Sequence, residues 1–200
     1  MGRRNAEVEV VVNSTWSAIK ADVTRYSRGP HAHHRTFLYL LRHYGLRATA
    51  TYRLGRKLLT WTRSPAIVIA LPLWPVYWIG AALARYGYGI HLSLTAEIGP
   101  GLYIGHLGGI CLANCSLGSQ CSIGQQTKIG SLTERQGPRI GSRVWIGAHS
   151  KIVGTVVIED GATIGAGARV TADVSARTLV MGDPARAISR NYDNTSLLLL

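Results

Sequence analysis

His106 stands in a glycine-rich stretch, GHLGG, at residues 105–109. An imidazole with a pKa near 6.5 accepts and releases a proton at neutral pH, so this residue could take part in acid–base chemistry. The glycines beside it would let a substrate approach the backbone closely. A solvated histidine at a corner of the fold is the alternative, and the surrounding pattern decides between the two.

Three cysteines, Cys111, Cys115 and Cys121, follow shortly after this stretch. Their odd number, with no other cysteine in the chain, argues against a disulfide framework and favours a reducing, cytoplasmic compartment. Their spacing lacks a fourth ligand and a nearby pair of histidines, so we expect no zinc site.

An aliphatic residue recurs every six positions from residue 98 to residue 170, with one extra residue after the third repeat and an interruption at 131–138. A small or β-branched residue stands four places after most of them. The twelve aliphatic positions are Ile98, Ile104, Ile110, Leu117, Ile123, Ile129, Ile140, Ile146, Ile152, Ile158, Ile164 and Val170. Repetition of this kind indicates a solenoid whose repeats stack on one another.

A period of six fits a coil of three short strands. If six residues make one strand and one turn, three units close a triangular coil of about 18 residues. The aliphatic side chain then points inward, the small residue fits the cramped corner, and glycine relieves the turn. Twelve positions in groups of three therefore predict four coils of a mainly β, parallel β-helix.

The first third of the chain differs in composition from the rest. Residues 1–65 contain twelve Arg or Lys and three acids, whereas residues 66–200 contain ten and seven. We predict helices over residues 36–88, where Leu and Tyr alternate with Arg at helical spacing, and a polar segment before them. The positive charge favours contact with an anionic surface, and no nucleic-acid-binding module is recognisable.

Residues 64–84 carry no charge and are long enough to cross a bilayer. Pro65, Pro72 and Pro75 should break or kink a continuous helix, so we predict a buried or interfacial helix pair rather than a span. Tryptophans near this segment suit a membrane surface. We therefore predict that residues 1–88 form a basic, helical region that contacts the inner face of the membrane. A helical cap packed on the rest of the protein is the alternative.

The repeats and the closing motif together resemble those of the hexapeptide-repeat acyltransferases, especially the serine acetyltransferase branch. The resemblance covers residues 90–190 and lies in IGPGLYIGHLGGICL, RIGSRVWIGAHSKIVGTVVIEDGATIGAGARV and VMGDPARAI. It implies a left-handed parallel β-helix at residues 89–187, followed by a tail at residues 188–200. It also implies acetyl-CoA as cosubstrate, no metal, and a homotrimer with active sites between neighbouring β-helices.

In that branch the histidine of the equivalent turn is the general base, which implies this role for His106. It would take a proton from an acceptor hydroxyl as the hydroxyl attacks the acetyl thioester. His91 stands where the family has an aspartate that orients the base. The resemblance implies coenzyme A recognition by turns and side chains along the coils, at Gly130, Ser131, Ala148, Lys151, Ala166 and Arg186.

The residues that hold serine in that branch are replaced in this chain. The aspartate directly before the histidine is Gly105, and the Arg-His pair of the later loop falls on Gln136 and Gly137. A site without these charges suits a neutral polyol better than a zwitterionic amino acid. The N-terminal segment is also similar in style to acetyltransferases of polysaccharide clusters. We therefore predict an acetyl-CoA-dependent O-acetyltransferase acting on a small-molecule or lipid-linked sugar.

Two other functions stay open, and a third lacks its ligands. A serine O-acetyltransferase of cysteine biosynthesis would have to work without the replaced residues. A zinc enzyme of the γ-carbonic anhydrase kind needs three histidines, which His91, His106 and His149 do not supply at the required spacing. A non-catalytic β-helix scaffold predicts that His106→Ala changes nothing.

Overall fold

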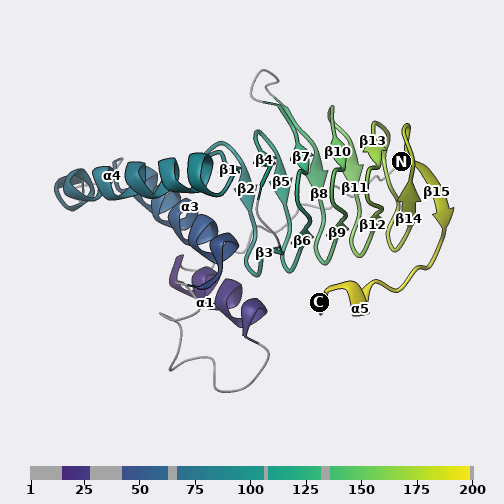
Figure 1. Cartoon of the computed structure of the whole chain (residues 1–200), viewed down its shortest axis with the longest axis horizontal. Helices are drawn as coiled ribbons and strands as arrows, with labels where there is room; N and C mark the ends of the chain where they lie inside the picture. Colours follow the sequence, from purple (N-terminus) through teal and green to yellow (C-terminus); the bar gives the residue numbers. More distant parts are fainter. Residues whose placement is uncertain (1–14, 28–41, 63–66, 106–107, 132–135, 199–200) are drawn as a thin grey trace, which may run out of the picture.

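The computed structural model describes residues 15–27, 42–62, 67–105, 108–131 and 136–198. Helices gather at one end of the molecule, and a solenoid of short strands forms the rest (Figure 1). The solenoid is a parallel β-helix of about four turns, which confirms the fold class that the period of six predicts.

The strands of the solenoid form three faces. Their bounds are β1 (Ile90–Leu92), β2 (Glu97–Ile98), β3 (Tyr103–Ile104), β4 (Ile110–Leu112), β5 (Ser116–Leu117), β6 (Ser122–Ile123), β7 (Lys128–Ile129), β8 (Arg139–Ile140), β9 (Trp145–Ile146), β10 (Lys151–Ile152), β11 (Val157–Ile158), β12 (Thr163–Ile164), β13 (Arg169–Val170), β14 (Leu179–Met181) and β15 (Arg186–Ser189). Sheet A has the order β1-β4-β7-β10-β13, sheet B β2-β5-β8-β11, and sheet C β3-β6-β9-β12-β14-β15. Neighbouring strands of a sheet thus come from successive coils.

The aliphatic repeat fills the interior of the coils. In sheet C, Ile104, Ile123, Ile146 and Ile164 lie in register on successive coils, and each is at most 2% exposed. The small residues predicted at the corners are also buried: Cys121, Thr127, Val144, Ser150, Val156, Ala162, Ala168 and Val174. Removal of this apolar surface from water is what holds each coil on the next.

The register corrects one predicted position. In sheet A, Leu112 and not Ile110 lies opposite Ile129. Ile104 and Leu112 are eight positions apart in the sequence, whereas their partners on the next coil, Ile123 and Ile129, are six positions apart. The two additional residues lie in the turn at 105–109, so the even spacing of the isoleucines conceals a longer turn at the candidate catalytic residue.

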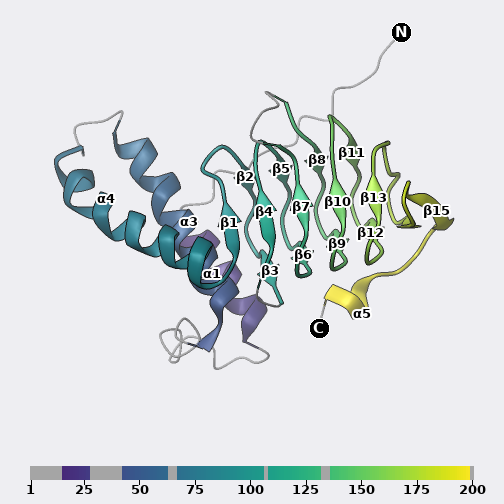
Figure 2. The same cartoon turned by 45° about the horizontal axis from the view of Figure 1, so that its top comes forward.

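The ends of the solenoid extend past the predicted repeats. Ile90 of β1 and Val180 of β14 are buried in the same core, and β15 turns back antiparallel on β14. The chain then runs back along the coils to α5 (Thr195–Leu198) (Figure 2). The side-chain nitrogen of Asn194, Nδ2, donates to three main-chain carbonyl oxygens at 3.0–3.2 Å, those of Arg143, Gly161 and Ala162.

Three helices and a π-helical turn cover the start of the solenoid: α1 (Thr15–Tyr26), α3 (Tyr44–Trp61), α4 (Ile67–Ala82) and η2 (Leu83–Gly87). The polar composition of the first 35 residues does not predict α1. The helix forms because Ala18, Asp22, Val23 and Tyr26 recur on one face, which is buried against α3 and β3. One of these four residues, Asp22, is charged, which weakens the pattern in the sequence.

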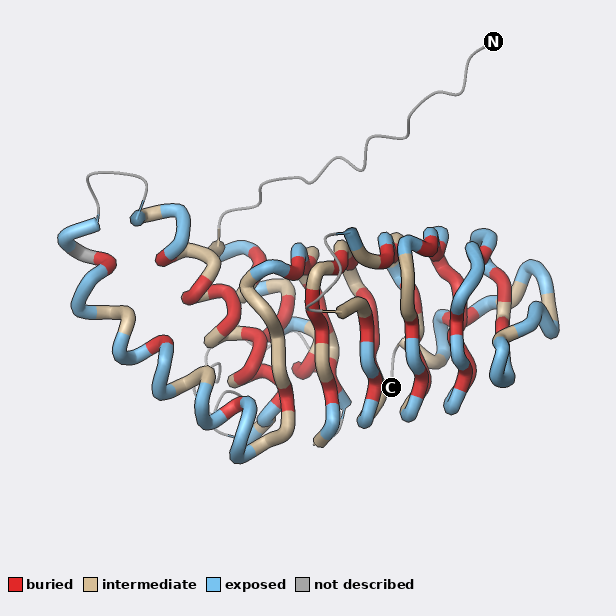
Figure 3. Tube along the Cα trace, turned by 90° about the horizontal axis from the view of Figure 1, so that it is seen from above, coloured by how far each residue is buried: buried red, intermediate tan, exposed pale blue. Residues whose placement is uncertain are grey.

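The predicted helix pair at residues 64–84 is wrong, because α4 is one helix with Pro72 and Pro75 inside it. Each proline deprives a carbonyl, that of Val68 or Leu71, of its helical partner. These residues lie on the exposed side of α4, where water reaches the unpaired carbonyls, and the opposite side packs on α3 (Figure 3). Among the described residues, no helix is long and apolar enough to span a bilayer.

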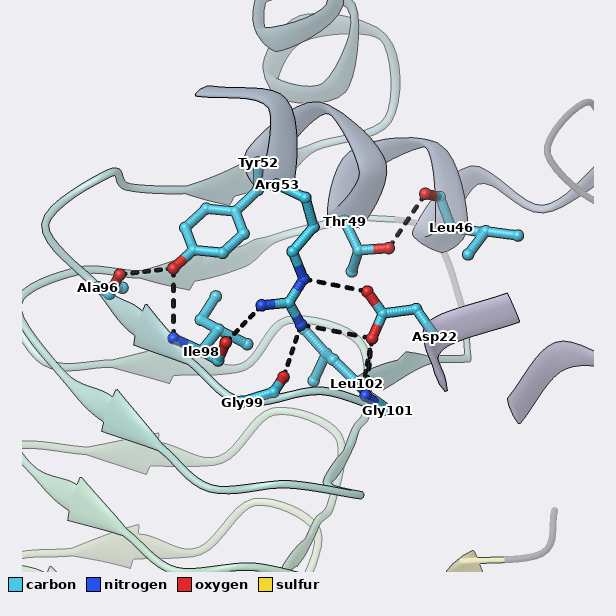
Figure 4. Close-up of polar contacts among 10 residues, drawn as sticks. All are labelled: Asp22, Leu46, Thr49, Tyr52, Arg53, Ala96, Ile98, Gly99, Gly101 and Leu102. Carbon is cyan, nitrogen blue, oxygen red and sulfur yellow. Dashed lines mark hydrogen bonds and ion pairs between the residues drawn. The ribbon is translucent and has the colours of Figure 1, made fainter. Parts of the chain in front are cut away.

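A buried ion pair joins the helices to the first coil (Figure 4). Arg53 of α3 donates from Nε to Asp22 of α1 at 3.2 Å and from its terminal nitrogens to the carbonyls of Ile98 and Gly99. Asp22 Oδ1 also accepts the backbone N–H of Gly101 at 2.8 Å. The pair therefore ties two helices and the coil into one unit, and loss of either partner would leave a buried charge unpaired.

Candidate active site

The turn between β3 and β4 lies beside the helical end of the solenoid. His106 itself lies outside the described residues, but the part of the turn that follows it is held by two backbone hydrogen bonds. Gly108 N–H donates to the carbonyl of Tyr88 at 3.0 Å, and Ile110 N–H donates to that of Gly89 at 3.0 Å. A Cβ at Gly89 would lie 3.0 Å from Gly108 Cα, so the segment after η2 packs directly on this turn.

His91 stands on β1, the strand next to this turn. It is half-buried, and its Cα pairs with that of Cys111 on β4. Burial, and then the positive charge of Arg85, lower the pKa of His91 below its usual value, so the imidazole is mostly neutral at pH 7. A neutral imidazole donates one hydrogen bond and accepts another, which suits an orienting residue. Its role toward His106 stays a prediction.

A row of cations follows the outer face of sheet A. Lys128 of β7, Lys151 of β10 and Arg169 of β13 pair in register, and all three are exposed. Neighbouring strands lie about 4.8 Å apart, so these like charges stand side by side, which is unfavourable without an anion. Within the described residues no acid forms an ion pair with any of the three. The row therefore suits phosphate groups.

Small residues line the corner at which the strands of sheet A begin. A Cβ at Gly124 would lie 2.6 Å from the nitrogen of Ala148, and a Cβ at Gly147 would lie 2.6 Å from that of Ala166. The two alanines thus stack on successive coils, and Ala166 is exposed. The coils are therefore packed closely at this corner, and its side chains are small.

Gly130 and Ser131 lie at the opposite edge of sheet A, where β7 ends. Gly130 has a φ of 70°, and a side chain there would collide with the carbonyl of Ala113. The carbonyl of Ser131 accepts a hydrogen bond from Asn114 Nδ2 at 2.8 Å. The sheet therefore separates these two residues from the alanine corner.

Arg186 begins β15 and is exposed. The segment before it extends sheet A, because Arg169 N–H donates to the carbonyl of Gly182 at 2.9 Å and Ala185 N–H donates to that of Arg169 at 2.8 Å. Arg186 thus lies beyond the last strand of the row, far along the solenoid from the His106 turn. Of the described residues predicted for catalysis or coenzyme A binding, all lie on sheet A or at its edges except Arg186, whose strand β15 belongs to sheet C.

Sequence reasoning missed two members of the row, Lys128 and Arg169. Each stands directly before an aliphatic residue of the repeat, as Lys151 does. That shared position places all three on the outer face of the same sheet, and it is the signal that could have found them.

Two surface cavities lie away from this row. One of about 460 Å³ is lined by Arg25, Arg143 and Arg177 with residues of the C-terminal segment, and one of about 400 Å³ is lined by Gln136 and Gly137 with residues of sheet B. Among the described residues, neither cavity includes a side chain of the cationic row. In the same part of the chain no three His, Cys, Asp or Glu side chains gather to hold a metal.

Comparison with known proteins identifies the class. Residues 137–172 match the family model described as bacterial transferase hexapeptide (six repeats). Serine acetyltransferases of Staphylococcus epidermidis and Helicobacter pylori are 33% and 30% identical over 126 and 122 residues, which cover 58% of this chain and 59% and 71% of those proteins. A chloramphenicol acetyltransferase of Agrobacterium fabrum is 43% identical over 61 residues, 30% of this chain and 29% of that protein.

Solved structures agree with this. The serine acetyltransferase of Neisseria gonorrhoeae has a TM-score of 0.73 and 26% identity, covering 91% of this chain and 69% of that chain. A serine acetyltransferase in complex with coenzyme A, 23% identical with a TM-score of 0.68 over 88% of this chain and 70% of that one, shows the same fold. The chain therefore belongs to the hexapeptide-repeat acyltransferases, which are left-handed parallel β-helices. Within them it is similar to serine acetyltransferases, and it spans less than two thirds of the Staphylococcus and Agrobacterium proteins.

Proposed function

We propose that this protein is an acetyl-CoA-dependent O-acetyltransferase with its active site along the outer face of sheet A. The observation that carries the proposal is that the turn of His106, the alanine corner and the cationic row all border this face. Lysine and arginine side chains of the row fit the phosphates of coenzyme A, and the small corner residues leave room for its pantetheine arm. The relatives named above are acetyltransferases, which supports the same reaction.

The proposed reaction needs one base and one oxyanion site. His106 removes the proton of an acceptor hydroxyl while the oxygen attacks the thioester carbonyl carbon. The carbonyl oxygen becomes an oxyanion, which N–H groups of the glycine-rich turn would stabilise. The C–S bond then breaks, the acetyl group stays on the acceptor oxygen, and the sulfur takes the proton that His106 received. His91 would position His106 as a neutral hydrogen-bonding partner.

Two classes of acceptor are supported by different observations. The comparisons favour L-serine, because the longer matches named above are serine acetyltransferases. The uncharged residues Gly105, Gln136 and Gly137 favour a neutral sugar hydroxyl, small or lipid-linked, because a buried carboxylate and ammonium would lack partners there. Gln136 and Gly137 lie beside sheet B, so they would meet the acceptor only in the site of a neighbouring copy. The relatives give serine the broader support, and the sugar rests on the chemistry of these three positions.

A homotrimer is part of the proposal. The cationic row lies on the exposed face of sheet A. A neighbouring copy of the chain would cover this face and exclude water from the reacting groups. Size-exclusion chromatography with light scattering should then give about 65 kDa, three times the 21.6 kDa of one chain. A monomer that turns over at full rate would contradict this arrangement.

The first experiment measures thiol release from acetyl-CoA with L-serine and a panel of sugars and lipid-linked oligosaccharides as acceptors. Loss of a general base costs about 10²–10⁴-fold in rate, so His106→Ala should lose that factor. The matched control is His149→Asn, because His149 has a φ of 62°, which asparagine tolerates, and it should retain turnover. No turnover with any acceptor, together with no binding of coenzyme A, would overturn the proposal and favour a scaffold.

A second variant separates the two acceptor classes. A Cβ at Gly105 would meet nothing closer than Tyr103 Cε1 at 3.4 Å, so an aspartate fits there. If serine is the acceptor, Gly105→Asp offers its ammonium a partner, and kcat/KM for serine should rise. If a sugar is the acceptor, the new charge should lower kcat/KM for the sugar.

A further inference from the structure

An apolar face on α4 and η2 points away from the rest of the protein. The inner side of α4 packs on α3 through Leu73, Trp74 and Tyr77. Its outer side is also apolar, with six side chains that are 55–81% exposed: Val68, Leu71, Val76, Trp78, Ile79 and Tyr86. Surface helices normally carry polar residues on this side. A continuous apolar face of this size marks an interaction surface.

The part of the sequence that contains this face carries charge of one sign. Between Asp22 and Glu97 the chain contains ten Arg or Lys and no acid. Two of the described cations in this segment lie near acids: Arg53 is paired with Asp22, and Arg56 lies 4.0 Å from Glu97. Arg85 is exposed at the end of the apolar face, on η2. Such a combination of apolar and cationic groups complements the surface of a bilayer, which has anionic headgroups outside and apolar acyl chains beneath them.

The length and the charge of this helix favour binding in the plane of a bilayer over crossing it. The 16 residues of α4 span about 24 Å, less than the roughly 30 Å of a hydrocarbon core, and η2, which continues the helix, carries the charged Arg85. Pro72 and Pro75 leave two carbonyls without helical partners on the outer side. Water and headgroups can hydrate these carbonyls at the interface, whereas the hydrocarbon centre cannot. Trp78 and Tyr86 are of the types that concentrate at this depth.

A second copy of the chain is the competing occupant of this face. Pairing two such faces would bring together two helical regions of net positive charge, which electrostatic repulsion opposes. Anionic headgroups have no such penalty.

We propose that the outer face of α4 and η2 docks into the interface of a bilayer that contains anionic phospholipids. This docking does not depend on acetyl transfer. One consequence does rest on the proposed function: because Tyr88, just after η2, contacts the turn of His106, docking would hold the proposed reaction close to the headgroups.

The test is sedimentation of the full chain with vesicles of phosphatidylcholine alone or mixed with phosphatidylglycerol. The wild type should bind the mixed vesicles and release in high salt. The double variant Val68→Gln/Ile79→Gln should weaken partitioning by about tenfold or more, because two exposed apolar side chains no longer enter the interface. The control Ile188→Gln changes an equally exposed apolar residue on β15 and should bind like the wild type.

Three outcomes overturn the proposal. These are no binding to mixed vesicles by the wild type, equal binding by the double variant, or assembly beyond a trimer that the double variant abolishes without any lipid effect. Circular dichroism of each variant shows whether it is folded. His106→Ala should bind vesicles like the wild type, so failure of the proposed catalysis and failure of docking are distinguishable.

Discussion

Cys115 and Cys121 point into the coils, whereas Cys111 stands on the outer face of sheet A. Burial raises the pKa of Cys115 and of Cys121 to about 12. At pH 8 roughly one such thiol in ten thousand is ionised, and the thiolate is the reactive form. We therefore expect the native protein to react rapidly with a disulfide reagent at one thiol only, that of Cys111. Mass spectrometry of the labelled peptides checks this.

Cys111→Ser should abolish the rapid phase while leaving two slow thiols that react after unfolding. A rapid phase that survives in Cys111→Ser would show that a coil opens, and the assignment of the two buried thiols would be wrong.

The pKa of His91 gives a pH dependence with a definite sign. Burial and Arg85 lower it below about 6.5, so the unfolded chain takes up a proton at a higher pH than the folded chain does. The contribution of His91 to stability is therefore present above about pH 6.5 and is lost as the pH falls through its folded pKa. Thermal denaturation from pH 7.5 to pH 5 should show a steeper loss for the wild type than for His91→Gln.

Arg85→Gln provides the control for this measurement. It removes the second cause of the shift and should make the loss shallower without removing it. Parallel curves for wild type and His91→Gln would mean that the imidazole is as hydrated in the fold as in the unfolded chain.

Residue types alone suggest part of the candidate site. His106 is predicted because a histidine in a glycine-rich turn matches a family motif, and its role stays a prediction because it lies outside the described residues. Lys128 and Arg169 were not predicted, because only the pairing of strands shows that they share a face with Lys151. The longer turn was also hidden, since Ile110 keeps the count of six although Leu112 occupies the equivalent position.

At the scale of the coils, the residue after most of the inward aliphatic residues is glycine because neighbouring turns lie too close together for a side chain there. A Cβ at Gly147 would lie 2.6 Å from the nitrogen of Ala166 and 2.8 Å from its Cα, and a backbone cannot move as a side chain can. Gly147→Ala should therefore lower the free energy of unfolding by about 1–3 kcal/mol in urea denaturation.

Gly105→Ala is the matched control, because Gly105 occupies the equivalent position in sheet C with only an ordinary contact to Tyr103. It should change stability by about 0.5 kcal/mol or less. Equal effects of the two substitutions would show that loss of glycine freedom, and not contact between turns, explains the requirement.

The elements were predictable where one physical requirement dominates. The coils were, because a core that repeats every six residues admits little variation. α1 was not, because its buried face includes Asp22, whose partner Arg53 lies 31 residues away in the sequence. The continuity of α4 was not predictable. The expectation that proline breaks a helix leaves out two things that stabilise α4: water at the exposed carbonyls and the packing of its other side.

At the scale of the whole molecule, the solenoid has an exposed end that needs a cap. In a solenoid each coil contacts only its neighbours, so the last coil lacks support on one side. The C-terminal segment supplies it: β15 pairs with β14, and Asn194 reaches carbonyls of the two coils before them. The sequence of this segment carries no repeat and so gave no sign of this role.

Asn194→Ala should therefore loosen the molecule from this end only. Three carbonyl oxygens lose a buried donor, which costs about 1–3 kcal/mol. Because coils transmit stability only to their neighbours, hydrogen exchange should speed up in β9 and β12, whose preceding carbonyls Asn194 contacts, and stay unchanged in β1 and β4, next to the helices. Ser196→Ala, an exposed change in the same segment, should alter neither region. If exchange speeds up equally along all coils, the solenoid unfolds as one cooperative unit and the segment is not a local cap.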